Sequence, residues 1–151
     1  MSGSRCQLLV MASAAALSLA ACGEEGVPPG PDVRVSGARV RSVAGSDANT
    51  AAYMILRNAG GDRDRLTGAR SEVARMTELH RTTIDETGLA RMGKVEGLDL
   101  PAGSTVVMEP GGFHFMLMGV TRTLSEGDTI RITLILEASG PVSVAAEVGA
   151  F

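Results

Sequence analysis

The sequence predicts a single all-β domain, an antiparallel sandwich or barrel, that follows a processed leader. From Val33 onward, short runs rich in Val, Ile, Leu and Thr alternate with clusters of Gly, Pro, Asn, Asp and Ser. This spacing is typical of antiparallel β-proteins. The composition is 44% hydrophobic but only 3% aromatic, so the core must consist of aliphatic side chains and methionine. A chain of 151 residues can bury such a core without disulfides.

The leader occupies the first 21 residues. One early positive charge precedes an Ala-rich apolar run that is too short to span a bilayer, which indicates a secretory signal peptide. The Leu-Ala-Ala-Cys tetrad that ends at Cys22 resembles the lipobox of bacterial lipoproteins, in which the cysteine is lipidated. Ordinary cleavage, which leaves Cys22 as a free thiol, is the alternative. Residues 22–32 are rich in Pro and Gly and predict a tether to a domain over residues 33–151.

This leader places the domain outside the cytoplasm. We expect a periplasmic protein that is held at a bacterial membrane by a lipid anchor, or a soluble periplasmic protein if Cys22 is not acylated. Gly23 differs from the usual inner-membrane retention residue, Asp, which favours the outer membrane. The formal charge is −3 and the basic residues are scattered, so nucleic acid is not an expected partner.

The domain divides into nine predicted strands, each ended by a turn cluster such as residues 58–61, 85–88, 110–112 or 125–128. One segment, residues 71–83, also has apolar residues near helical spacing, but a turn followed by a strand suits its β-rich surroundings better. The alternating charges of residues 62–65 indicate a solvated loop. The predicted strands are residues 33–43, 51–57, 65–70, 75–83, 90–95, 105–109, 113–120, 129–137 and 142–148.

The strand predicted at residues 113–120 carries the chemistry. Side chains alternate along a strand, so His114, Met116 and Met118 share one face while Phe115 and Leu117 share the other. A methionine stripe is more often core than metal site, because Met fills gaps in aliphatic cores. If the methionine face were core, however, Phe115 and Leu117 would face solvent. We therefore predict that Phe115 and Leu117 are buried and that the His/Met face points outward.

Imidazole and thioether ligands select a soft metal ion, above all copper(I). A thiolate site is excluded in the mature domain, because Cys6 leaves with the signal and Cys22 is acylated. Thioethers also suit an oxidising compartment, where thiols form disulfides. The chain has only two histidines, and the second of them, His80, stands upstream of Met92.

The full spacing is His80-x11-Met92-x21-His114-x-Met116, which resembles the signature of the periplasmic copper chaperone PCu(A)C family. The resemblance extends over residues 33–149. It includes the segments Ala51-Ala52-Tyr53, Leu66-Thr67-Gly68-Ala69, Glu78-Leu79-His80, Leu100-Pro101-Ala102-Gly103 and Pro110-Gly111-Gly112.

The resemblance implies a cupredoxin-like Greek-key β-sandwich or barrel that binds one copper(I) per chain through His80, Met92, His114 and Met116. Met118 is a possible auxiliary ligand, an entry-path sulfur or simple packing. Many family members have Met directly after the first His, where this chain has Arg81.

The family's function, carried over to this chain, is copper(I) delivery to cytochrome c oxidase, at its CuA centre or a neighbouring copper site. The expected partner is a copper-accepting oxidase subunit or another copper chaperone, and the expected state is a monomer. We expect no enzymatic activity, because four ligands leave no open coordination position and both histidines are used. Two alternatives stay open: a copper storage or resistance protein, and a structural or interaction lipoprotein domain that binds no metal.

Overall fold

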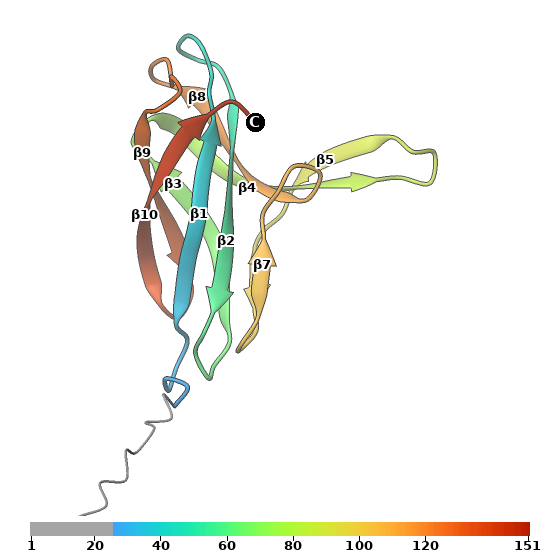
Figure 1. Cartoon of the computed structure of the whole chain (residues 1–151). Coiled ribbons are helices and arrows are strands. Elements are labelled where there is room, and N and C mark those ends of the chain that lie inside the picture. The colour runs from blue at the N-terminus through green and yellow to red at the C-terminus, as the bar shows by residue number, and fades with distance from the viewer. Residues whose placement is uncertain (1–25) are drawn as a thin grey trace, which may run out of the picture.

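The computed structural model describes residues 26–151, and this range contains ten β-strands and no helix (Figure 1). No segment of residues 26–151 forms a helix able to cross a membrane. The strands are β1 (Val33–Arg41), β2 (Thr50–Asn58), β3 (Asp64–Ser71), β4 (Ala74–Ile84), β5 (Ala90–Lys94), β6 (Leu98–Leu100), β7 (Thr105–Val107), β8 (Phe113–Val120), β9 (Thr129–Leu136) and β10 (Gly140–Gly149).

All ten strands belong to one sheet, in the order β5-β4-β8-β2-β1-β10-β9-β3-β6, with β7 paired to β2. Only the β1–β10 pair is parallel among the paired strands described. Because β3 also lies against β4, the sheet curls into a closed sandwich. The outer part of the β4–β5 hairpin projects from its side (Figure 1). The predicted all-β class is confirmed.

The nine predicted strands are present, with ends that differ by a few residues, and residues 74–84 form a strand rather than a helix. The short strand β6 was not predicted. It pairs Leu98 and Leu100 with β3, and both leucines are buried, but three residues before a proline carry too little alternation to predict a strand. The signal peptide and Cys22 lie outside the described residues.

The described part of the predicted tether contacts the domain. The amide of Gly61 donates to the carbonyl of Pro28 at 3.0 Å, and the amide of Ala59 donates to the carbonyl of Asp32 at 2.8 Å. A Cβ at Gly60 would lie 2.1 Å from the carbonyl oxygen of Gly30, so only glycine permits this close approach. The segment from Pro28 onward is thus packed against the loop after β2.

The core contains the inward-facing side chains of the sheet. Phe115 and Leu117 on β8 are both 0% exposed, which confirms their predicted burial. Leu79 on β4 and Ala52 on β2 lie on the same inner face, because each pairs with Phe115. The opposite face of these strands is therefore the one that carries the histidines.

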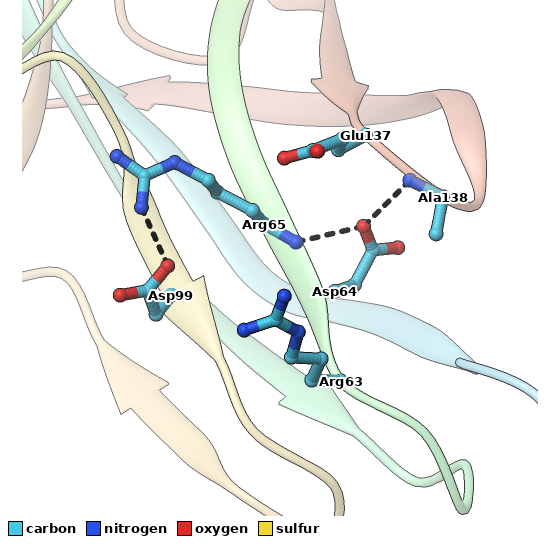
Figure 2. A pocket seen from close by; sticks show the side chains of 6 residues that line it. All are labelled: Arg63, Asp64, Arg65, Asp99, Glu137 and Ala138. Carbon is cyan, nitrogen blue, oxygen red and sulfur yellow. Dashed lines mark hydrogen bonds and ion pairs between the residues drawn. The ribbon is translucent and has the colours of Figure 1, made fainter.

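Asp64 holds the far end of the sandwich together, and it is 4% exposed rather than solvated as predicted for its charge run. Its Oδ1 accepts from the amides of Arg65 and Ala138 (Figure 2). Its Oδ2 accepts from the amide and hydroxyl of Ser139. Burial alone would raise the pKa of this carboxyl, but the hydrogen bonds outweigh burial and lower it. The charge run therefore contributes a structural carboxylate that joins β3 to the β9–β10 turn.

We expect Asp64→Asn to lower the free energy of unfolding by about 1–3 kcal/mol at neutral pH, because donors lose an acceptor in a buried position. The folded pKa lies below the unfolded one, so this stability is present above the unfolded pKa and is lost as pH falls through the folded pKa. Urea unfolding measured at several pH values should show that the difference in free energy of unfolding between wild type and variant becomes smaller below about pH 4.

Asp99→Asn is the matched control in the same pocket (Figure 2). Asp99 pairs with Arg65 at 2.6 Å, but its side chain is 74% exposed, so its loss should cost less than about 0.5 kcal/mol. Equal losses in the two variants would contradict the structural role of Asp64.

Candidate metal centre

The four predicted ligands come from three adjacent strands and lie on one face of the sheet. His80 on β4 pairs directly with His114 on β8, and Met92 on β5 pairs with Thr82, two residues after His80. Residues that pair across strands, or that stand two apart on one strand, share a face. Met116 lies two residues beyond His114. The register thus gathers His80, Met92, His114 and Met116 on the outer face of the β5-β4-β8 strands.

His114 is oriented by the turn that precedes its strand. Its Nδ1 lies 3.1 Å from the carbonyl oxygen of Gly112, and a carbonyl can only accept, so Nδ1 carries the hydrogen. Its Nε2, with the free lone pair, lies 3.0 Å from the sulfur of Met92. Burial lowers the pKa of His114, and nearby His80 adds to this, while the bond to Gly112 acts against it. The imidazole is thereby kept neutral, with Nε2 and a thioether sulfur facing the same space.

His80 is oriented by a carboxylate. Its Nε2 donates to Oε2 of Glu78 at 3.1 Å, and its Nδ1 is buried with no hydrogen-bond partner among residues 26–151. The rings of His80 and His114 have centroids 6.0 Å apart. Because Glu78 holds the other nitrogen, Nδ1 is the atom of His80 whose lone pair is free to bind a ligand.

Glu78 contacts the site but was not predicted from the sequence to belong to it. Its Oε1 also accepts from Nζ of Lys94 on β5 at 3.2 Å. The hydrogen bond from His80, followed by that from Lys94, lowers the pKa of Glu78. The signal was present in the sequence, since Glu78 stands two residues before His80 and must share its face in a strand. A carboxylate behind a ligand histidine is a common outer-shell arrangement in metal sites.

The His/Met face points away from the core as predicted, but it is not uniformly exposed. His114 is only 4% exposed, because the rings of Tyr53 and His80 and the thioether of Met92 surround it, whereas Met92 is 55% exposed. A shallow cavity opens beside these groups and is lined by Met92, His114 and Met116 together with Tyr53 and Arg41. The methionines and His114 therefore line the cavity, while His80 does not line it and is connected to it through its ring contact with His114.

Met118 lies on the same face but outside this cavity. Its cross-strand partner is Met76 on β4, which is 53% exposed. This pair lies two residues along each strand from the Glu78–Met116 pair. Arg81 points to the opposite face and stacks on Phe113, with its Cζ 5.1 Å from the ring centroid. Neither residue belongs to the group formed by the two histidines, Met92 and Met116.

The donor set fits a soft monovalent ion. Two neutral imidazole nitrogens and two thioether sulfurs carry no net charge, and thioethers bind copper(I) far better than hard divalent cations. Within residues 26–151 no group of three or more His, Cys, Asp or Glu side chains could hold a metal ion.

Solved structures of PCuAC domains share this cupredoxin-like β fold. The copper-bound PCuAC domain from PmoF2 is similar with a TM-score of 0.65 and 25% identity, covering 79% of this chain and 93% of that one. The solution structure of CuI-DR1885 from Deinococcus radiodurans is 38% identical, with a TM-score of 0.59, and the match covers 74% of each chain. The fold and the His/Met site thus define a PCuAC-type domain.

The family model described as "Putative lipoprotein LpqE-like" matches residues 33–148. Putative lipoprotein Lxx21020 of Leifsonia xyli subsp. xyli (strain CTCB07) is 38% identical over 115 residues, which cover 74% of this chain and 68% of that protein. The chain belongs to this LpqE-like lipoprotein family, which is of the PCuAC type, and the resemblance found in the sequence is confirmed.

The hydrogen bond between His80 and Glu78 should fix the tautomer of His80 in the metal-free protein. We expect the ring of His80 to be protonated at Nε2 in the wild type, because Glu78 accepts that hydrogen, and to become a mixture of tautomers in Glu78→Leu. The ¹⁵N chemical shifts of the His80 ring report this directly.

Lys94→Met is the matched control, because it removes the other partner of Glu78 and leaves the bond to His80 intact. The same tautomer mixture in Lys94→Met, or an unchanged His80 spectrum in Glu78→Leu, would contradict the orienting role of Glu78.

Proposed function

We propose that this protein is an extracytoplasmic copper(I) metallochaperone that holds one copper(I) through His80, Met92, His114 and Met116. The observation that carries the proposal is the approach of Nε2 of His114 to the sulfur of Met92 at 3.0 Å. Both atoms are electron-pair donors that face the same space. The ring of His80, whose Nδ1 has no hydrogen-bond partner, has its centroid 6.0 Å from that of His114. The similarity of this chain to the copper-bound PCuAC domain from PmoF2 and to CuI-DR1885 supports copper(I) as the ligand.

The site suits transfer better than catalysis. Four protein ligands fill the coordination sphere of copper(I), so no position is left to activate a substrate. Met92 is half exposed and opens to the cavity, so an incoming ligand can replace the thioethers first while the two imidazoles keep the ion bound. We therefore propose a carrier that releases copper(I) by stepwise ligand exchange, and not an enzyme.

The destination that we propose is cytochrome c oxidase, at its CuA centre or a neighbouring copper site, through an oxidase subunit or a second chaperone. The proposed signal peptide of residues 1–21 and lipidation at Cys22 keep the carrier on the periplasmic side of a membrane, with the outer membrane favoured. Residues 22–32 then link the anchor to the domain of residues 33–151, which we propose acts as a monomer.

Met118 has a separate proposed role. Met118 pairs with Met76 on β4. These two residues place two further thioethers on the same face as the four proposed ligands. We propose that Met118 is an auxiliary sulfur on the entry path, outside the coordination sphere.

Copper(I) titration against a chromogenic chelator tests the ligand assignment. We expect one equivalent bound by the wild type. Loss of an outer-shell partner typically lowers metal affinity about 10–100-fold. His114→Ala and Met116→Ala each remove a direct ligand, so the copper(I) affinity should fall by more than that. Met118→Leu should change affinity only slightly. Copper(I) should also raise the melting temperature, because the ligand binds only the folded protein.

Met108→Leu is the matched control, since Met108 is buried in the core and the substitution removes a thioether at nearly constant volume. Unchanged binding in both His114→Ala and Met116→Ala would refute the site. Absence of any thermal stabilisation would favour a domain that binds no metal.

Deletion of the gene tests the destination. Loss of oxidase activity, restored by added copper, is the expected phenotype of a delivery chaperone. Copper sensitivity with normal oxidase activity would instead identify a storage or resistance protein.

A further inference from the structure

Two arginines lie on β1 near the His/Met site, and one of them, Arg41, lines its cavity. Arg39 and Arg41 are two residues apart on β1, so they share a face, and both are exposed. Arg39 pairs directly with Tyr53 on β2, and the Tyr53 ring lies 6.2 Å from that of His114. Arg41 lines the same cavity as Met92 and His114. Arg39 lines a different cavity, which it shares with Glu109 and Glu147. Arg41 thus stands at the His/Met site and Arg39 lies beside it on the same face of β1.

An aromatic ring orders both guanidinium groups. The Cζ atoms of Arg39 and Arg41 lie 4.6 Å and 5.9 Å from the centroid of the Phe151 ring. Phe151 in turn packs edge-on against Tyr53, with centroids 5.7 Å apart. Stacking on an aromatic face restrains an arginine but leaves its N–H groups free to bind a planar anion. The pair is thus preorganised beside the site.

Neither guanidinium has an ion-pair partner within 4.0 Å in the part of the chain that the structure describes. Glu147 on β10 is opposite Arg39 in register, but no ion pair joins them. The protein as a whole carries a formal charge of −3, so this cationic pair contrasts with the rest of the molecule. Two fixed and unpaired guanidinium groups are well suited to carboxylates, which they bind bidentately.

We propose that Arg39 and Arg41 form a docking surface for a copper-accepting protein whose metal site is rimmed by Asp and Glu carboxylates. This inference rests on the proposed function and specifies, in addition, that the acceptor protein is negatively charged around its metal site. Docking of carboxylates on this pair brings the soft ligands of the acceptor to the cavity where Met92 and Met116 are accessible. Complementary charge of this kind acts mainly on the rate of encounter and on the choice of partner.

The test uses two acceptor peptides with the same Met-x-x-Met-x-x-Met sequence and a fluorophore quenched by copper(I), one flanked by Glu and the other by Lys. Stopped-flow transfer from the copper(I)-loaded protein at low ionic strength should be about tenfold faster to the Glu-flanked peptide. The preference should diminish as salt is added. In Arg39→Gln/Arg41→Gln it should be lost.

Arg70→Gln/Arg131→Gln is the matched control, because it removes the same charge from exposed arginines on β3 and β9 and should keep the wild-type preference. If the wild type binds copper(I) but shows no preference, or if both double variants lose it equally, the docking surface is refuted while the carrier function stands. Failure of the wild type to bind copper(I) overturns both.

A lipid surface is the other anionic partner that an arginine pair could bind, and it gives a different result. Co-sedimentation with phosphatidylglycerol vesicles that is lost in Arg39→Gln/Arg41→Gln, together with equal transfer rates to the two peptides, would overturn the proposal.

Discussion

The register of β4 against β8 is the constraint on which the site depends. His80 pairs with His114, and the same row continues to Lys94 on β5 and, through the Tyr53 ring, to Arg39 on β1. A slip of one residue would turn His80 to the core and Leu79 to solvent. Burial of Leu79, Phe115 and Leu117 prevents that slip, because each contributes apolar area that the shifted register would expose. The core therefore fixes the position of the four proposed ligands without containing any of them.

The two histidines are held by different means, and each leaves a different nitrogen free. A backbone carbonyl, that of Gly112, holds Nδ1 of His114, whereas a carboxylate, that of Glu78, holds Nε2 of His80. The carbonyl of Gly112 also accepts from the amide of Thr82 on β4, so the turn before β8 is tied to the strand that carries His80. The hydrogen bonds that orient the rings thus also join the two strands, which couples the geometry of the site to the pairing of β4 with β8.

Local pattern was enough to predict the strand of His114 and Met116, because alternation along one strand separates Phe115 and Leu117 from the His/Met face. Assigning His80 and Met92 to the same site as His114 and Met116 required the family resemblance, because no local sequence rule pairs residues so far apart in the chain. The contribution of Tyr53 and Phe151 could not be predicted at all, because their rings meet only through the pairing of β1 with β2 and the return of the chain after β10. The carboxylate of Asp64 was misinterpreted for the same reason: its donors at Ala138 and Ser139 are distant in sequence.

The distribution of exposure across the site bears on how an ion would be held and released. The imidazoles are shielded and are held by hydrogen bonds to Gly112 and Glu78, so they act as fixed donors, while Met92 comes from the exposed hairpin strand β5, whose five residues are all accessible. Only one neighbour in the sheet supports β5, so its thioether can move at a lower energetic cost than a ring held between β4 and β8. In the proposed carrier, the interior strands would retain the ion and the edge strand would exchange it. That division follows from the strand order alone, because the sheet places the histidines on interior strands and Met92 on its last one.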